Sequence, residues 1–431
     1  MNDIIVKTND QLNEKYYKIS HKSGLDVYII PKEMSTTYAT FATRYGSMDN
    51  KFKLEGDKDF VSVPDGIAHF LEHKMFECED GKDVFELFAK TGANANAYTA
   101  NTMTSYLFSA TDNFYTSLEY LLDFVTHPYF TKENVEKELG IIGQEIRMYN
   151  DNPYSRMQRG LFESMYKYNK IRIDIAGTEE SIHKIDENLL YTCYNIFYNL
   201  HNMALVICGN VDVNKTISVL DKVLKESEQQ KIIRAYDDEN EPDSVVRDKV
   251  EIELEVAKPI FAIGIKDNDI SPDPYERMKK AYAVGILNNM LFSQSSELYN
   301  SLYEKKLIGF NLSFDFEHTK HYSHNVISAE SSSPYKAYEF FVNFIDLLKE
   351  KGLSYEDFEL CKKAELADSI KVFDSTEAIA EEFVFNLFDD ADMLDTADCI
   401  KSITFDYVND VFDNLFSKEK YTISVVMPKN K

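Results

Sequence analysis

The sequence predicts an α+β fold made of two similar domains in tandem. Three observations support it: strand-like and helix-like patterns occur in grouped runs, their order recurs in the second half, and a polar stretch separates the halves. The chain has 431 residues, which suits two to three domains of about 100–200 residues each. Apolar residues make up 44% of it and charged residues 28%, which is typical of a globular protein rather than a disordered chain or a fibre.

The separating stretch runs from about residue 226 to residue 248. It is polar, interrupted by Pro242, and contains the acidic run Asp237-Asp238-Glu239-Asn240-Glu241. This composition is typical of a linker or a long exposed loop. We therefore predict a first domain over residues 1–230, a linker over 231–248 and a second domain over 249–431.

Apolar periodicity and turn residues predict the elements of the first half. Two strand-like runs flank the turn His21-Lys22-Ser23-Gly24, which indicates a hairpin, and the run Asn150-Asp151-Asn152-Pro153 is a strong helix terminator. The expected elements are strands at 16–20, 25–31 and 38–45, helices at 65–76 and 82–90, two strands within 93–110, helices at 113–125 and 131–149, and a strand at 203–208.

The second half repeats this order. Ser109-Ala110 and the two helices that follow it resemble Ser328-Ala329 and helices near residues 335 and 354, at an offset of about 219 to 223 residues. Lys74-Met75-Phe76 corresponds only loosely to Met290-Leu291-Phe292. The repeat therefore predicts one structural unit used twice.

The charge of the chain is strongly acidic. Lys and Arg number 47 and Asp and Glu number 73, so the net charge is −26. A surface of this kind repels phosphate backbones, which argues against a nucleic-acid-binding protein. Solubility accounts for most of the charge, and some carboxylates could also line a cavity that receives basic or extended peptides.

The number and spacing of the cysteines, and the lengths of the apolar runs, bear on where in the cell the protein is expected. Five widely spaced cysteines without a Cys-x-x-Cys pair predict neither a disulfide framework nor a cysteine zinc site. The N-terminal residues do not read as a signal peptide, and no apolar run approaches 18 residues. We expect a soluble cytoplasmic protein without a membrane span.

One segment carries the pattern of a metal-binding helix. His69 and His73 are four residues apart, so both imidazoles project from one face of a helix and can reach one zinc ion at about 2.0–2.1 Å. Glu72 borders the same face, where it can take a proton from water. This His-x-x-Glu-His order is the inverzincin motif. A helix with two half-buried histidines and an exposed glutamate would show the same spacing.

A third ligand is expected from another helix, because catalytic zinc has three protein ligands and one open position. Glu138 and Glu145 lie seven residues apart on the helix predicted at 131–149, and so share a face. Gly140 and Gly143 lie between them and would allow a close helix contact. Glu145 as ligand with Glu138 behind it is the functional interpretation, and a solvated acidic face is the alternative.

The order of five segments resembles the pitrilysin family, which includes insulin-degrading enzyme and the mitochondrial processing peptidase. The similarity is greatest to its short bacterial members of about 430 residues, and it is clear over residues 16–211. The segments are 66–77, Asn96-Ala97-Tyr98-Thr99, 138–145, Gly177-Thr178-Glu179-Glu180-Ser181-Ile182, and 202–212. The resemblance implies two homologous domains, each a mostly antiparallel sheet packed with helices, that together enclose a cavity.

The resemblance also implies a zinc site. His69, His73 and Glu145 match the zinc ligands of the family, Glu72 matches its general base, and Glu138 matches the acidic residue that supports the site. The implied activity is that of a zinc metalloendopeptidase with one zinc ion per chain, which hydrolyses peptides or unfolded segments with metal-activated water. A zinc-bearing subunit that only binds peptides or acts as a scaffold is the alternative.

Asn96 and Ala97 match the edge-strand residues with which the family holds the main chain of its substrate. A peptide that adds to an open strand edge gains affinity from backbone hydrogen bonds, and so can be bound without a strict sequence. The peptide is therefore the expected partner at this strand.

The second half departs from the family pattern. The stretch that supplies an Arg and a Tyr in the family has Tyr303 and Gly309 at those places, and the places of His69, Glu72 and His73 fall near Gly285, Asn288 and Asn289. The second domain is therefore expected to be metal-free. The missing groups favour a heterodimer with a metal-free homologous subunit, with a homodimer or a self-sufficient monomer as alternatives.

The remaining histidines are expected to be structural or solvated. His318, His321 and His324 have a spacing that could bind metal, but we expect a solvated hairpin loop there. His127 is expected in a loop, and His183 and His201 are expected to be structural. The acidic run Glu239-Asn240-Glu241 is expected to be solvated linker.

Overall fold

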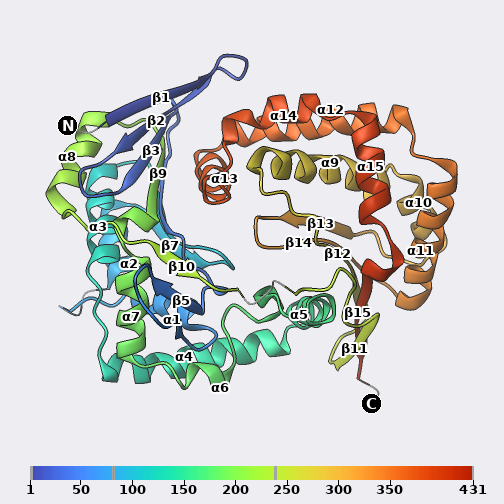
Figure 1. The fold of residues 1–431 in the computed structure, drawn as a ribbon, viewed down its shortest axis with the longest axis horizontal. Helices are drawn as coiled ribbons and strands as arrows, with labels where there is room; N and C mark the ends of the chain where they lie inside the picture. The colour runs from blue at the N-terminus through green and yellow to red at the C-terminus, as the bar shows by residue number, and fades with distance from the viewer. Residues whose placement is uncertain (1–2, 80, 82, 237–239, 430–431) are drawn as a thin grey trace.

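The computed structural model of the protein describes residues 3–79, 81, 83–236 and 240–429. Within these residues a seven-stranded, a five-stranded and a three-stranded sheet are combined with helices (Figure 1). The seven-stranded sheet lies in the first half of the chain and the five-stranded sheet in the second half. The predicted α+β class is confirmed.

The large sheet of the first half has the strand order β1-β2-β3-β9-β4-β8-β7. Neighbouring strands are antiparallel except β3 and β9, which are parallel. The hairpin predicted around residues 21–24 is confirmed as β2 and β3. The strands are β1 (Asp3–Asn9), β2 (Glu14–Ser20), β3 (Asp26–Pro31), β4 (Thr37–Thr43), β7 (Asn94–Thr99), β8 (Thr104–Ala110) and β9 (Met203–Gly209).

The sheet of the second half repeats five of these strands in the same arrangement. Its order is β11-β15-β12-β14-β13, and its one parallel pair, β11 with β15, occupies the place of β3 with β9. The strands are β11 (Lys249–Leu254), β12 (Ile260–Asp267), β13 (Leu312–His318), β14 (Ser323–Glu330) and β15 (Tyr421–Pro428). The tandem repeat predicted from the sequence is therefore confirmed at the level of topology.

The four helices predicted in the first half are confirmed as α1 to α4, and α5 to α8 are further helices that were not predicted. The side chain of Thr131 caps the long helix α4, and Asn152 with Pro153 ends α4 and starts α5. The helices are α1 (Ile67–Lys74), α2 (Val84–Thr91), α3 (Phe114–Thr126), α4 (Lys132–Asp151), α5 (Pro153–Met165), α6 (Glu179–Ile182), α7 (Glu187–Phe197) and α8 (Val213–Val223).

The second half continues with seven further helices among the described residues. The helices predicted near residues 335 and 354 are α11 and α12. The seven are α9 (Pro274–Phe292), α10 (Glu297–Glu304), α11 (Pro334–Lys351), α12 (Tyr355–Lys371), α13 (Thr376–Phe388), α14 (Thr396–Ser402) and α15 (Phe405–Leu415).

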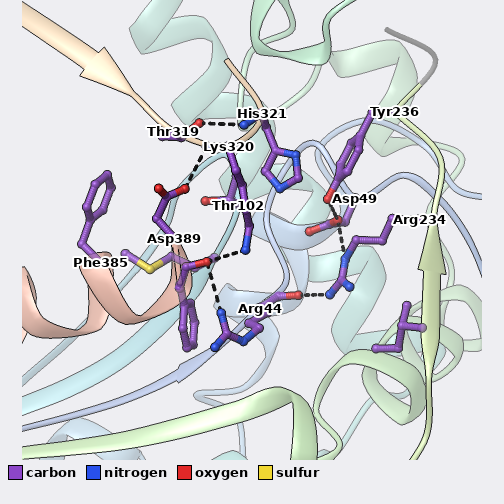
Figure 2. Close-up of a pocket in the computed structure, with 13 residues that line it drawn as sticks. Arg44, Asp49, Thr102, Arg234, Tyr236, Thr319, Lys320, His321, Phe385 and Asp389 are labelled. Atoms are coloured by element: carbon purple, nitrogen blue, oxygen red, sulfur yellow. Dashed lines mark hydrogen bonds and ion pairs between the residues drawn. The ribbon is translucent and has the colours of Figure 1, made fainter. Parts of the chain in front are cut away.

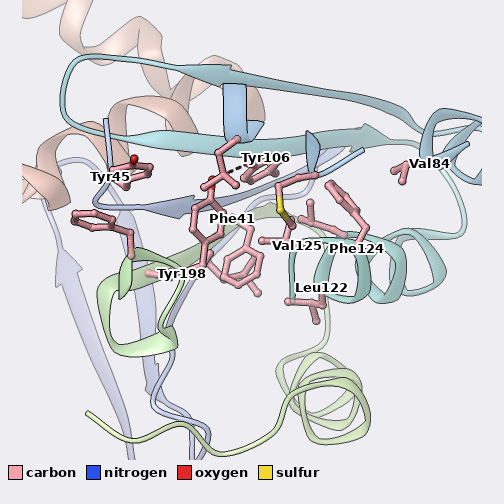
Figure 3. Packing of buried hydrophobic residues seen from close by; sticks show 14 of the residues in the cluster. Phe41, Tyr45, Val84, Tyr106, Leu122, Phe124, Val125 and Tyr198 are labelled. Carbon is pink, nitrogen blue, oxygen red and sulfur yellow. Dashed lines mark hydrogen bonds between the residues drawn. The ribbon is translucent and has the colours of Figure 1, made fainter. Parts of the chain in front are cut away.

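Tyrosine and phenylalanine supply the aromatic packing of the core between the first sheet and its helices, where they lie among aliphatic side chains such as Leu122 and Val125 (Figure 3). Phe124 of α3 packs edge-on against Tyr106 of β8, with ring centroids 5.7 Å apart. The buried hydroxyl of Tyr106 is hydrogen-bonded to that of Tyr198 at 2.8 Å. The hydroxyls of Tyr106 and Tyr198 therefore satisfy each other inside the core.

Each half contributes one helix to the sheet of the other half. α13 of the second half packs on β4 and β9 of the first sheet, where Phe383 contacts Tyr28 with ring centroids 5.2 Å apart. α5 of the first half packs on β12 and β15, and Gly264 of β12 allows the close approach of Met165. Since α5 follows α4 and α13 follows α12, the two exchanged helices hold equivalent places in the repeat (Figure 1).

The segment between the two sheets is partly ordered by pairing. Its strand β10 (Ile232–Arg234) pairs with β5 (Lys51–Leu54), which also pairs with β6 (Val61–Ser62). The proposed division of the chain at residues 231–248 stays a prediction.

The expectation that the acidic run at 239–241 is solvated is wrong for Glu241. Its carboxylate accepts the backbone N–H groups of Lys167, Tyr168 and Asn169 and binds Lys266 Nζ, because these N–H groups lie in the loop after α5, where they have no helical partner. Glu239 lies outside the described residues. In the described part of the chain no helix is both long and apolar enough to cross a bilayer.

Candidate metal centre

Two glycines fix the start of α1, the helix that carries the His-x-x-Glu-His motif. Gly66 has φ +91°, and a Cβ there would lie 2.4 Å from the carbonyl oxygen of Ala176. Gly177 has φ +73°, and a Cβ there would lie 2.5 Å from the carbonyl oxygen of Asp65, which also accepts the Ser181 hydroxyl at 2.7 Å. The two loops therefore touch through positions that exclude other residues.

His69, His73 and Glu145 come together from α1 and α4, with one nitrogen or oxygen of each within 4.8 Å of the others. Glu145 Oε1 lies 3.7 Å from His69 Nε2, and Glu145 Oε2 lies 3.5 Å from His73 Nε2. Two ligand atoms on a tetrahedral zinc ion, each about 2.0–2.1 Å from it, are about 3.4 Å apart. The spacing is therefore that of ligands around a metal ion, and longer than that of direct hydrogen bonds.

Glu138 supports this group from behind. Its Oε1 lies 3.1 Å from His73 Nδ1, which holds the Nδ1–H tautomer and leaves the lone pair of Nε2 facing Glu145. Lys74, fully buried, lies 3.6 Å from the other oxygen of Glu138 and 2.8 Å from Glu77. A carboxylate, an imidazole and an ammonium group thus orient one another, and the residues present fit a zinc ion.

Glu72 is only 8% exposed and lies on α1 between the two histidines and β7. The hydroxyl of Thr99 donates a hydrogen bond to Glu72 Oε2 at 2.8 Å. Burial raises the pKa of Glu72, and the Thr99 hydrogen bond opposes that rise. Its second oxygen is the one that this contact leaves available for a proton.

The two histidines differ in their electrostatic surroundings. Burial, together with a smaller effect of the nearby imidazole of His73, lowers the pKa of His69 to about 4. Burial also lowers the pKa of His73, but the hydrogen bond to Glu138 and the charges of Glu72, Glu138 and Glu145 outweigh it and raise the pKa. His69 is therefore a neutral donor at pH 7, as a metal ligand must be.

Asn96 and Ala97 lie on β7, the edge strand of the first sheet. The Ala97 N–H donates to the side-chain oxygen of Asn96 at 2.9 Å rather than to a neighbouring strand. An added strand would take over this N–H from the Asn96 side chain, and α1 packs against the same strand.

The second half keeps the outline of this centre without the histidines. Asn289 Nδ2 of α9 donates to Glu365 Oε2 of α12 at 3.2 Å, and a Cβ on Gly285 would lie 2.9 Å from Glu365 Oε1. Gly285 and Asn289 thus face Glu365 as His69 and His73 face Glu145. Burial, with a smaller effect of Asp368, raises the pKa of Glu365 to about 7. Asn288 pairs instead with Asn325 in the core.

The expectation of a solvated loop at the other histidine cluster is wrong. His318 donates or accepts a hydrogen bond with Ser323 Oγ at 2.7 Å, and His324 is 1% exposed beside Tyr166. His318 is the last residue of β13 and His324 lies in β14, so neither is in the loop that joins the two strands. The turn between these strands is held by Lys320, whose backbone N–H donates to Asp389 at 2.8 Å.

His321 of the same turn lines a pocket of about 240 Å³ between the halves, together with Arg44, Arg234 and Tyr236 (Figure 2). Arg44 donates to the carbonyl oxygens of Leu387 and Phe388 at the end of α13, and Arg234 is paired with Asp49. These contacts tie the first half to the second. The pocket contains none of the residues of the candidate metal centre.

His127 is exposed at the end of α3, as expected, and Tyr303 is exposed on α10. Gly309 lines a small pocket with Tyr154 and Phe310. Sequence reasoning missed Thr99 and Lys74, although Thr99 closes the quoted run Asn96-Ala97-Tyr98-Thr99 and Lys74 directly follows His73.

Comparisons with known proteins match both halves of the chain. The family model described as insulinase (peptidase family M16) covers residues 63–179, and the one described as the peptidase M16 inactive domain covers residues 184–365. The uncharacterised zinc protease YmfH of Bacillus subtilis is 41% identical over 427 residues, which are 98% of each chain.

Solved structures show the same fold. An M16-like peptidase from Alicyclobacillus acidocaldarius superposes with a TM-score of 0.92 at 32% identity, over 96% of this chain and 99% of that chain. Pitrilysin superposes with a TM-score of 0.71 at 16% identity, over 100% of this chain and 47% of that chain, which shows the fold alone.

Proposed function

The chain belongs to the insulinase family of peptidases, family M16, and from this we propose that it is a zinc metalloendopeptidase that uses Glu72 as its general base. The observation that carries the proposal is the meeting of His69, His73 and Glu145, with Glu72 beside them. Three ligands and an adjacent carboxylate suit a catalytic zinc site, which keeps one position open.

The residues of the chain divide the reaction among them. A bound zinc ion supplies Lewis acidity to the water and to the scissile carbonyl. Glu72 takes the proton of the attacking water and returns it to the leaving amide nitrogen. Thr99 orients Glu72 through one oxygen, and Glu138 keeps His73 in the tautomer that can bind metal.

The proposed substrates are peptides or unfolded segments in extended conformation. The free edge of β7 can pair with such a segment through the Ala97 N–H, with Asn96 beside it. An unstructured segment has unpaired backbone groups along both of its sides, so the strand edge favours unstructured chains.

A partner subunit is part of the proposal. Tyr303 and Gly309 stand where the family supplies an Arg and a Tyr, so we expect a metal-free homologous subunit to supply them, with a homodimer as the alternative. The chain purified alone should cleave a quenched peptide weakly in the presence of zinc, and gain activity with its partner. Full activity from a monomer would contradict obligatory pairing.

The substitution Glu72→Gln tests the function itself. Wild type should contain one zinc ion per chain, and the variant should keep it while cleavage falls by about 10²- to 10⁴-fold, because the metal ligands remain and the base is lost. Glu86→Gln, in an exposed position on α2, is the matched control and should cleave normally. Cleavage by the Glu72→Gln variant at the wild-type rate would show that Glu72 is not the general base. Absence of zinc from wild type would overturn the whole proposal and the zinc-bearing scaffold subunit with it.

A further inference from the structure

Tyr149 lies one helical turn after Glu145 on α4, and its hydroxyl donates a hydrogen bond to Glu145 Oε1 at 2.9 Å. Resting on the proposed zinc site, we propose that Tyr149 is a positioning residue that fixes the Glu145 carboxylate for metal binding. The spacing of four residues places the two side chains on the same face of the helix.

The two oxygens of Glu145 have different surroundings. Oε1 receives the Tyr149 hydroxyl and lies 3.7 Å from His69 Nε2, while Oε2 lies 3.5 Å from His73 Nε2. A phenol on Oε1 occupies one of its lone pairs and restricts rotation of the carboxylate. Oε2 is thereby left as the oxygen with which Glu145 binds a metal ion, and one oxygen rather than two is what a site with an open water position requires.

Tyr149 does for Glu145 what Glu138 does for His73. His73 and Glu145 each have a hydrogen-bond partner on α4 that is not itself a candidate ligand and that fixes the orientation of the side chain. Such partners commonly change metal affinity by 10- to 100-fold when they are removed. The site therefore has an outer support on two of its three ligands.

The metal-free counterpart in the second half shows no such arrangement. Glu365 faces Gly285 and Asn289 there, and the residue one turn later is Ser369. The hydroxyl of Ser369 donates to the carbonyl oxygen of Leu366 in its own helix. The half that carries the two histidines thus has a tyrosine hydroxyl hydrogen-bonded to its glutamate, whereas the serine hydroxyl at the equivalent place in the other half is bonded to its own helix.

The exposure of Tyr149 argues against a packing role. The residue is 36% exposed, and its neighbour Met148 is more exposed still. Loss of the hydroxyl alone should therefore leave the fold and its thermal midpoint unchanged, so Tyr149→Phe isolates the hydrogen bond. Tyr154→Phe is the matched control, since Tyr154 is 55% exposed at the start of α5.

The experiment measures metal binding rather than peptide cleavage. Zinc dissociation constants of wild type, Tyr149→Phe and Tyr154→Phe are determined by competition with a chelator, and the visible spectra of the cobalt-substituted proteins are compared. Tyr149→Phe should bind zinc about 10-fold or more weakly and change the intensity of the cobalt bands, because the carboxylate is free to bind through both oxygens.

Each outcome has a separate meaning. Equal zinc affinity and an unchanged cobalt spectrum in Tyr149→Phe would overturn the role of Tyr149 while leaving the zinc site intact. An equal loss of affinity in Tyr154→Phe would also overturn it, since the effect would not belong to the hydrogen bond. Failure of wild type to bind zinc or cobalt would instead overturn the proposed function on which this inference rests.

Discussion

The hydroxyl of Thr99 and the carboxylate of Glu72 are joined by a hydrogen bond of 2.8 Å that connects β7 to α1. Thr99 ends the strand on which Asn96 and Ala97 lie, so the candidate general base and the candidate substrate strand are positioned by one contact. The preceding residue of the same strand, Tyr98, donates to Glu381 of α13 at 2.5 Å. The second half of the chain thereby reaches the same strand.

Thr99→Val should lower peptide cleavage by about 10-fold or more, because a hydrogen bond to a charged carboxylate is lost from a buried site. Zinc content should stay at the wild-type value, since Thr99 contacts no candidate ligand. Thr99→Ser keeps a hydroxyl and should restore most of the rate. A Val variant as active as wild type would show that the contact does not position the base.

Glu138→Gln should weaken zinc binding by about 10- to 100-fold, because the hydrogen bond that fixes His73 loses its charged acceptor. Chelator competition gives the dissociation constants. Glu136→Gln, on an exposed turn of the same helix, should bind zinc as wild type does. Equal zinc affinities of the Glu138→Gln and Glu136→Gln variants would show that Glu138 does not support the zinc site.

The combined substitutions Gly285→His and Asn289→His should create a second zinc site. Glu365 already faces both positions, and its flexible side chain needs to move by only a few tenths of an ångström, since a Cβ at Gly285 meets Oε1 at 2.9 Å. Metal analysis should give two zinc ions per chain where wild type gives one. Adding Glu365→Ala should return the count to one; a single ion in the double variant would argue against the structural correspondence.

The stability of the fold should fall as the pH drops from about 6.5 to about 4. Burial lowers the pKa of His318 to about 4 in the folded protein, whereas an unfolded histidine titrates near 6.5. The unfolded chain therefore binds the proton first, and this one residue costs about 3 kcal/mol of unfolding free energy over that range.

Urea unfolding at several pH values measures this dependence. His318→Asn keeps a donor near Ser323 and should flatten the slope, even if the variant is less stable at pH 7. His127→Asn, at an exposed position, should leave the slope unchanged. The same slope in His318→Asn would assign the loss of stability to other groups.

Part of the first half, including α1 to α4, and the motif of the candidate site could be predicted from local sequence. Residues four apart on a helix share a face regardless of the rest of the fold, so His69 and His73 needed no tertiary information. Pro153 with Asn152 likewise ends α4 by local chemistry. These signals act within a few residues of each other.

The surroundings of the site depended on contacts between distant segments. Thr99 reaches Glu72 only because β7 lies at the sheet edge beside α1, and Glu241 is held only because α5 ends next to it. His318 was expected to be solvated because its neighbours in the sequence are polar. Its burial depends on how the strands pack, which the local sequence does not indicate. Polar residues whose partners come from another segment of the chain, as Glu241 and Asn169 do, cannot be distinguished from solvated ones in a single sequence.

The exchange of α5 and α13 between the halves has a consequence for biosynthesis and folding. While only the first half has left the ribosome, the face of its sheet formed by Tyr28, Val206 and their neighbours has no cover, because α13 is still to be made. The sheet of the second half in turn relies on a helix made much earlier. The two repeats therefore complete each other's sheets only late in synthesis.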